Sequence, residues 1–178
     1  TTLFRSAKVY DETRKRGIQF THAFAQSSEH YFGGIQIENN PNIDVLKEQY
    51  AYVVRQELRG WNLKRFARAF FARGLYQFAV NKVQPLNIDP GSRFCYIDPR
   101  GVVFPSVVHN YPMGYLADIE KWDEIWQSEK AQVAREKVRT DNRRAWMICT
   151  ARTAIMKHPL RVAQFVAAGK MGHISLDA

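Results

Sequence analysis

Two stretches with apolar residues at helical spacing, separated by Gly60, constrain the fold of this chain most strongly. Residues 43–59 follow Asn42, a good helix N-cap, and residues 63–80 come soon after the glycine. The apolar positions are Val45, Leu46, Tyr50, Val53, Val54 and Leu58 in the first stretch and Leu63, Phe66, Ala67, Phe70, Phe71, Leu75 and Phe78 in the second. Because the connection is short, the sequence predicts two antiparallel helices packed as a helical hairpin.

The segment before this hairpin has the pattern of one helix followed by one strand. Residues 3–16 have an imperfect helical period, and Gly17 is well suited to end a helix. Apolar residues then alternate with polar or small ones over residues 18–25, which is typical of a strand. Since a helix, a glycine and a strand form one step of an α/β barrel or sheet, the expected fold class is α/β (or α+β).

The clearest β-hairpin signal lies in the middle of the chain. Residues 93–97 and 102–104 are separated by Asp98-Pro99-Arg100-Gly101. Proline presets φ for a turn and glycine tolerates positive φ, so this tetrapeptide predicts a tight turn. After Gly114 the sequence predicts only helices, over residues 118–126, 129–138, 142–157 and 160–168. The expected N-caps of the second and third helices are Ser128 and Asp141, and Pro159 lies in the expected first turn of the fourth.

The chain carries a large excess of positive charge. It has 26 Lys and Arg against 17 Asp and Glu, which gives a net charge of +9 at pH 7. Such an excess attracts acidic or polyanionic partners over long range. Between Lys64 and Arg73, basic residues alternate with Phe66, Phe70 and Phe71, which fits either an RNA-binding face or the solvated basic face of an amphipathic helix.

Cysteine content and hydropathy favour a cytoplasmic protein without a membrane partner. The two cysteines, Cys95 and Cys149, exclude the disulfide framework of small secreted domains, although a single bond between them stays open. No apolar run approaches the roughly 20 residues that span a bilayer, and the amino terminus has no signal-peptide pattern. The motifs of serine hydrolases, zinc proteases and nucleotide-binding loops do not occur in the sequence.

Several short motifs follow one another in a fixed order from Cys95 to Pro159. They are Tyr96-Ile97-Asp98-Pro99-Arg100-Gly101-Val102-Val103-Phe104-Pro105, Pro112-Met113-Gly114-Tyr115-Leu116, Glu124-Ile125-Trp126-Gln127-Ser128-Glu129-Lys130-Ala131 and Trp146-Met147-Ile148-Cys149-Thr150-Ala151-Arg152. This order resembles the carboxy-terminal, SPASM-type auxiliary-cluster region of radical SAM proteins. Upstream, Thr21-His22-Ala23-Phe24 and Ser28-Glu29-His30-Tyr31-Phe32-Gly33 resemble the last strand and exit loop of the partial α/β barrel in that family.

The resemblance implies three segments and an incomplete enzyme. Residues 1–40 would be the last helix and strand of the partial barrel, residues 41–84 a helical hairpin, and residues 85–178 a degenerate SPASM-like cap. The family uses a [4Fe–4S] cluster and S-adenosyl-L-methionine, which are held by an amino-terminal C-x-x-x-C-x-x-C loop. Because that loop is not present in this sequence, we expect a carboxy-terminal part or subunit that closes the substrate site of a radical SAM core segment and is not catalytic alone.

The auxiliary-cluster positions of the family are mostly replaced in this chain. By the resemblance they fall at Ile88, Ser106, Asp141, Ala145 and Cys149, and only the last of these is a cysteine. A cubane cluster needs four protein ligands, usually thiolates. An intact auxiliary cluster is therefore not expected.

The candidate cofactor-binding residues are His22, Ser28 and Glu29, which the resemblance places in the last barrel strand and in the exit loop near the SAM site. A structural interpretation stands beside each assignment. His22 would then be a buried histidine with satisfied hydrogen bonds, and the Ser28 side chain would cap a helix.

The candidate metal ligands are Cys149, Cys95 and His109. Structural alternatives again remain open, namely a small buried apolar role for Cys149 on a helix, packing within the hairpin for Cys95, and an exposed loop position for His109. A metal site rebuilt from Cys149, His109 and Asp141 is a further possibility.

A second hypothesis for function comes from a different class. The chain would be a cluster-free descendant that keeps the fold and uses its basic residues to bind RNA or an acidic protein surface.

Overall fold

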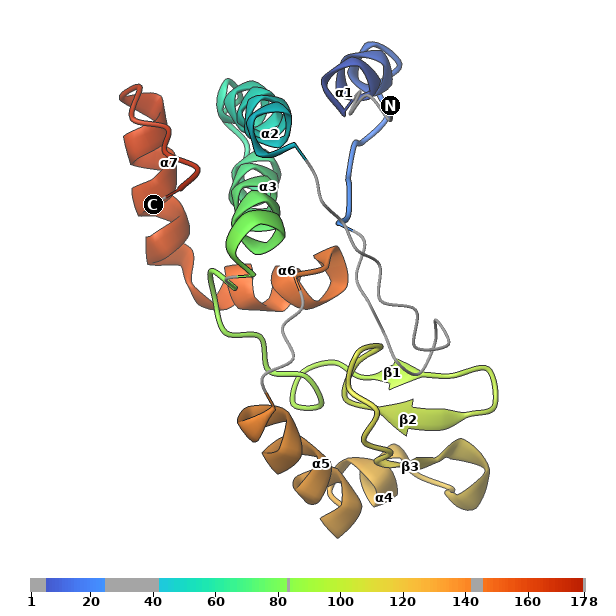
Figure 1. Ribbon diagram of the computed structural model, residues 1–178. Coiled ribbons are helices and arrows are strands. Elements are labelled where there is room, and N and C mark those ends of the chain that lie inside the picture. The colour runs from blue at the N-terminus through green and yellow to red at the C-terminus, as the bar shows by residue number, and fades with distance from the viewer. Residues whose placement is uncertain (1–5, 25–41, 83, 142–145, 178) are drawn as a thin grey trace. The chain divides into compact units, whose positions relative to one another are not determined.

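The computed structural model describes residues 6–24, 42–82, 84–141 and 146–177, and these residues are mostly helical (Figure 1). Within these ranges there are seven α-helices, one short 3-10 helix and a three-stranded antiparallel sheet, and the described residues form no barrel. The chain divides into two compact units. The described residues of unit 1 are 6–24, 42–82, 84–87 and 146–177, and those of unit 2 are 88–141.

Unit 1 is built on the predicted helical hairpin. Helices α2 (Ile43–Leu58) and α3 (Leu63–Asn81) pack against each other, and α1 (Ser6–Lys15) packs against α2. Helices α6 (Ile148–Lys157) and α7 (Pro159–Lys170) pack against α3. Asn42 caps α2 as predicted, because its side chain accepts a hydrogen bond from the Val45 N–H at 3.1 Å.

The core of unit 1 is aromatic and is completed by a residue from late in the sequence. Trp146 is fully buried, and its ring stacks on Phe71 at a centroid distance of 6.2 Å. The indole N–H donates a hydrogen bond to the Phe71 carbonyl at 3.0 Å. A Cβ atom on Gly74 would lie 2.5 Å from the indole nitrogen, so only glycine allows α3 to approach the indole this closely.

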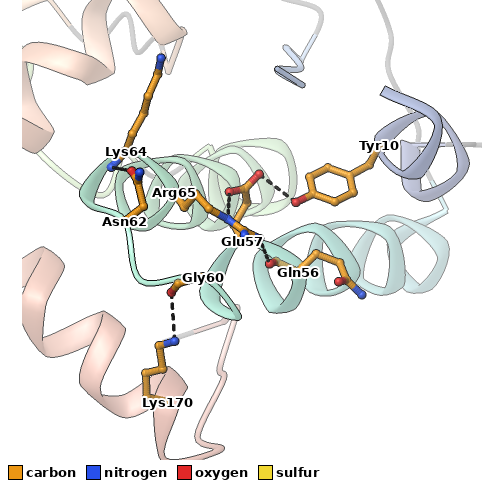
Figure 2. A network of polar contacts seen from close by, with 8 residues as sticks. All are labelled: Tyr10, Gln56, Glu57, Gly60, Asn62, Lys64, Arg65 and Lys170. Carbon is orange, nitrogen blue, oxygen red and sulfur yellow. Dashed lines mark hydrogen bonds and ion pairs between the residues drawn. The ribbon is translucent and has the colours of Figure 1, made fainter. Parts of the chain in front are cut away.

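A buried carboxylate joins α1 to the two helices of the hairpin (Figure 2). Glu57 is only 1% exposed and accepts hydrogen bonds from the Tyr10 hydroxyl at 2.9 Å and from Arg65 Nε at 3.1 Å. The guanidinium of Arg65 also donates to the Gln56 carbonyl. Burial, followed by the hydrogen bond to Glu57, raises the pKa of Tyr10 to about 12. The phenol therefore stays a hydrogen-bond donor throughout the physiological pH range.

The connection between α2 and α3 is held by two further hydrogen bonds that Figure 2 also shows. The Asn62 side chain caps α3 by accepting from the Lys64 N–H at 2.8 Å. The Lys170 ammonium, on α7, donates to the Gly60 carbonyl at 3.1 Å. The end of the hairpin is thus held by α7 as well as by its own capping residue.

The segment that follows α1 differs from the prediction of a strand. Gly17 ends α1 with a φ of +70°, as expected, but residues 18–24 belong to no sheet, and Figure 1 draws them as an uncoiled trace. The predicted alternation of side chains is nevertheless present. Phe20, His22 and Phe24 are half-buried or buried, whereas Thr21 and Ala23 are exposed. The segment is therefore strand-like in its side-chain pattern but has no neighbouring strand among the described residues.

Unit 2 contains the predicted β-hairpin. Strands β1 (Tyr96–Ile97) and β2 (Val102–Phe104) pair with Tyr96 opposite Phe104, and β3 (Gly114–Tyr115) pairs with β2 on its other side. β1 is shorter than the predicted strand 93–97, whereas β2 has the predicted bounds. Five buried residues form the core of unit 2, namely Val103, Met113, Ile125, Ala131 and Ala134.

The turn of the hairpin is organised by the buried side chain of Asp98. Its carboxylate accepts hydrogen bonds from the Arg100 and Val102 N–H groups, both at 2.9 Å, and from the Arg100 guanidinium. Burial alone would raise the pKa of Asp98, but these hydrogen bonds outweigh it and hold the pKa below its usual range. Gly101 completes the turn with a φ of +87°.

The later helices agree with the sequence at one boundary and differ at another. The Ser128 side chain caps α5 (Glu129–Thr140) as predicted, by accepting from the Ala131 N–H. The predicted helix 142–157 is wrong at its start, because α6 begins at Ile148; residues 142–145 lie outside the described residues. Asp141 does not cap α6, and its carboxylate accepts a hydrogen bond from the Tyr111 hydroxyl at 2.7 Å.

The remaining helical elements of unit 2 are short. In place of the predicted helix 118–126, the structure has a 3-10 helix η1 (Leu116–Asp118) followed by α4 (Trp122–Trp126).

In unit 1, Pro159 is the first residue of α7, as predicted. Among the described residues, no helix combines the length and the apolar character needed to cross a bilayer.

Candidate functional site

An open groove in unit 1 is the strongest candidate for a functional site. It has a volume of about 690 Å³ and lies between residues 19–21, the first turns of α3 and helix α6. Its apolar lining residues are Phe20, Leu63, Ala67, Ile148, Ile155 and Met156. Leu63 is 84% exposed and Met156 71% exposed, which is unusual for large apolar side chains that line one concave surface.

Three basic side chains surround this apolar lining. Lys64 and Arg68 are four residues apart on α3, so they lie on the same face of the helix, and Arg152 comes from α6. No lining residue is acidic. Within the described part of the chain, the ion pairs include none of these three cations. The groove therefore presents uncompensated positive charge around an apolar surface.

The position of Lys64 adds to this electrostatic imbalance. Lys64 lies in the first turn of α3, and that turn contains no acidic residue. The N-terminal end of a helix carries partial positive charge, so a cation is unfavourable there and an anion is favourable. An acidic ligand in the groove would relieve the repulsion between Lys64, Arg68 and the helix end.

The chemistry of the lining favours binding over catalysis. The groove is lined by alkyl, aromatic, hydroxyl, amide, ammonium and guanidinium groups and has no carboxylate, thiol or imidazole among its lining residues. General acid–base catalysis usually uses an imidazole or a carboxyl group. Apolar and cationic groups together are instead suited to an acidic, amphipathic segment of another polypeptide.

The structure places His22 beside the groove segment but against the core. Its ring lies 4.8 Å from that of Tyr50 and 5.2 Å from that of Phe20, measured between centroids. Both ring nitrogens are buried and have no hydrogen-bond partner among the described residues, so the interpretation as a satisfied histidine is wrong. Burial lowers the pKa of His22 to about 4. A cofactor-binding role for this covered ring stays a prediction, as it does for Ser28 and Glu29, which lie outside the described residues.

The candidate metal ligands have different surroundings. Cys149 is exposed on α6 in unit 1, so the alternative of a buried apolar role is wrong. Cys95 belongs to unit 2, where it is half-buried against the small core, and this burial raises the pKa of its thiol. A high thiol pKa disfavours the thiolate form that binds metal.

His109 is buried in unit 2 and is not the exposed loop residue of the structural alternative. Its Nδ1 lies 2.7 Å from Ser106 Oγ, and Ser106 is one of the five positions at which the resemblance predicted a cluster ligand. A hydroxyl–imidazole hydrogen bond therefore occupies this part of the hairpin end. Ser106 is itself buried, which indicates a structural pair.

These donors do not fit an iron–sulfur cluster. Among the described residues, no three His, Cys, Asp or Glu side chains come together in a way that could hold a metal ion. Of the five positions at which the resemblance predicted cluster ligands, only Cys149 carries a thiol, and that thiol is exposed on α6. No role for a cluster is therefore derived from the residues of this chain.

Sequence reasoning missed the groove because its signals are weak until the helices are assembled. Leu63 and Ala67 fit the apolar stripe of α3, and that pattern predicted a core position for Leu63, which the structure shows to be exposed. Comparison with protein-family models, with curated proteins and with solved structures found no match to this chain. Proposals about function therefore rest on the sequence motifs and on the geometry described above.

Proposed function

We propose that this chain is the carboxy-terminal part, or a separate carboxy-terminal subunit, of a radical SAM enzyme, and that it closes the substrate site without being catalytic alone. The partner would be a radical SAM core segment that supplies the C-x-x-x-C-x-x-C loop. Residues 18–24 would then be the last strand of a partial barrel. The proposal includes a cytoplasmic location, where the two cysteines would stay reduced.

The observation that carries this proposal is the strand-like segment without a strand neighbour. Alternate side chains of residues 20–24 pack on unit 1, and no backbone hydrogen bond joins residues 19–24 to another described residue. Unpaired N–H and C=O groups along an extended segment are a template for pairing with a strand of another chain or segment. A core segment that ends in a strand would satisfy them.

The groove supports the same proposal independently. Residues 19–21 form one wall of the groove, so a strand paired with this segment would reach the exposed Leu63 and Met156 side chains. Burying these apolar surfaces on a partner is favourable by about 25 cal/mol for each Å². The cations Lys64, Arg68 and Arg152 would select an acidic partner surface.

In this role the chain would shield the reacting groups of the partner's active site from water. The partner's cofactors would supply the radical chemistry, and the residues of this chain would bind the partner and exclude water from the reacting groups. The ordered motifs of residues 85–178, including the hairpin with its Asp98 turn, support assignment of these residues as the cap.

The proposal is tested by measuring binding of this chain to a radical SAM core polypeptide of the same organism that contains the three-cysteine loop. The decisive variant is Thr21→Pro, because Thr21 is exposed and proline removes one N–H from the segment. We expect Thr21→Pro to weaken binding by about ten-fold or more, which corresponds to a loss of about 1.4 kcal/mol.

Thr21→Ala is the matched control, since it removes the same side chain but keeps the N–H. It should bind the core polypeptide within a factor of about three of the unmodified chain, a difference below 1 kcal/mol. If the unmodified chain binds no such polypeptide, or if both variants bind equally well, the proposal is wrong.

The basic groove also favours a second candidate function, that of a cluster-free scaffold that binds RNA or an acidic protein. Lys64, Arg68 and Arg152 carry this alternative. An RNA-binding scaffold would show an affinity that falls steeply with salt, and charge-removing variants at these three positions would reduce the slope. The mostly aliphatic lining, with Phe20 as its one aromatic residue, favours a polypeptide over RNA, because protein surfaces that bind single-stranded nucleic acids usually offer several aromatic rings for base stacking.

A further inference from the structure

A second pocket in unit 1 lies on the side of α3 that faces α7 and the carboxy-terminal tail. It has a volume of about 490 Å³ and shares no lining residue with the groove. Two guanidinium groups, Arg73 from α3 and Arg161 from α7, line it together with the His173 imidazole. The pocket has no acidic lining residue.

The guanidinium of Arg73 is held in place but lacks a counter-ion. Its Nε donates to the Ser175 carbonyl at 3.2 Å, and its central carbon lies 5.4 Å from the centre of the Phe165 ring. Among the described residues no carboxylate pairs with Arg73 or with Arg161. Burial lowers the pKa of Arg73, which shows that its charge is partly removed from water. A charge in this setting gains from a bound anion.

The wall of the pocket formed by the carboxy-terminal tail is anchored to α2 and α3. The Leu176 side chain is buried, and the Asp177 carboxylate accepts from the Tyr76 hydroxyl at 2.9 Å and from the Lys47 ammonium. These contacts hold the Ser175 carbonyl against Arg73. The terminal nitrogens of that guanidinium have no hydrogen-bond partner among the described residues, so they are available to an oxyanion.

From this arrangement we infer that the pocket is a binding site for a small phosphomonoester. Two guanidinium groups match the charge of about −1.5 to −2 that a phosphomonoester carries at neutral pH. The volume exceeds that of a phosphate group alone and lies in the range of small-molecule sites. The Phe70 and Phe165 rings provide apolar surface for an organic body, and the Gln164 side chain offers a neutral hydrogen-bonding group.

Phenyl phosphate is a suitable probe because it combines a dianion with an aromatic body. Its binding to the full chain is measured by NMR titration, with the His173 imidazole signals as the local readout. The test variant is Arg161→Gln, because Arg161 is exposed and its loss should leave the fold intact. We expect Arg161→Gln to weaken phenyl phosphate binding by about ten-fold or more, as for loss of a charged hydrogen-bonding partner.

Arg55→Gln is the matched control, since Arg55 is exposed on α2, lines neither the pocket nor the groove, and its loss should leave phenyl phosphate affinity unchanged. Benzoate and a short single-stranded RNA are the competing ligands. The inference is wrong if phenyl phosphate does not bind, if the two variants bind it equally, or if benzoate or RNA binds in this pocket in preference to it. The phenyl phosphate result is independent of the binding test with the radical SAM core polypeptide, because Thr21 and the groove lie outside the pocket.

Discussion

Unit 1 buries large side chains from three separate stretches of sequence, whereas unit 2 is described over one continuous stretch and has a small apolar core. The fully buried side chains of unit 1 include Trp146, Tyr76 and Leu46. In unit 2 the buried core contains Met113 and Ile125 with Val103 and two alanines, and the Asp98 carboxylate organises the turn through local hydrogen bonds. Unit 1 therefore depends on long-range packing, and unit 2 depends more on local turn chemistry.

This difference implies that a substitution in one core should leave the other unit intact. Local stability can be followed separately in each unit by hydrogen exchange of the backbone amides. The following substitutions test that independence, and each has a distinct expected size.

The largest effect is expected for Trp146→Ala in unit 1. The substitution removes a fully buried indole, its stacking on Phe71 and its hydrogen bond to the Phe71 carbonyl. We expect the free energy of unfolding of unit 1 to fall by about 3–5 kcal/mol, as for other large aromatic residues in cores. Urea denaturation combined with hydrogen exchange measures this loss.

Trp61→Ala is the control for Trp146→Ala, because Trp61 is 86% exposed and lies over the Lys170 ammonium at 4.2 Å. Trp61→Ala should lower the free energy of unfolding of unit 1 by less than about 1 kcal/mol. Equal loss of amide protection in both units of Trp146→Ala would show that the two cores are not independent.

An intermediate effect is expected from pH, through His22 in unit 1. Its pKa of about 4 in the folded chain lies below the ordinary value of 6.5, so the unfolded chain binds a proton first as the pH falls. The stabilising contribution of the neutral ring is complete above about pH 6.5, decreases between about pH 6.5 and 4, and amounts to about 3 kcal/mol at most. Urea denaturation across this pH range measures the loss.

The variant His22→Phe isolates this contribution, since phenylalanine keeps an aromatic ring against Tyr50 and has no titrating nitrogen. The difference in unfolding free energy between the unmodified chain and His22→Phe should depend on pH only in that window. A difference that stays constant from pH 7 to pH 4 would mean that His22 is not buried in the neutral form.

The smallest effect is expected for Gly114→Ala in unit 2. A Cβ atom at this position would lie 2.7 Å from Ile125 Cγ1, in the middle of the small core. Overpacking of this kind costs about 1–3 kcal/mol, and only unit 2 should lose amide protection. The double variant Gly114→Ala/Ile125→Ala should be less destabilised than the sum of the two single variants, because the clash is absent. Full additivity would contradict the predicted contact.

The parts of the fold that could be predicted from sequence are those with local signals. The Asn42 and Ser128 caps, the Gly60 break and the Asp98 to Gly101 turn each act within a few residues, and the structure confirms them. The predicted start of α6 is wrong, because the prediction assigned Asp141 as its cap. Aspartate is a common helix N-cap residue, but the Asp141 carboxylate accepts a hydrogen bond from the hydroxyl of Tyr111, thirty residues away in the sequence.

The predicted site residues show the same limit. Alternation correctly indicated which side chains of residues 20–24 face the core, although Ile18 is exposed, and it could not indicate whether a neighbouring strand is present. The exposure of Cys149 and the burial of His109 depend on packing between elements, which periodicity does not report. The groove needed both α3 and α6 in place, because Lys64 and Arg152 are far apart in the sequence.

The late position of Trp146 in the sequence has a consequence for biosynthesis. Residues 88–141 leave the ribosome as one continuous stretch, before the indole that fills the centre of unit 1 has been made. Because domains fold as their residues emerge, unit 2 should become ordered while α2 and α3 still expose Phe71 to solvent. The nascent helical hairpin would then need protection from aggregation until translation has passed α7.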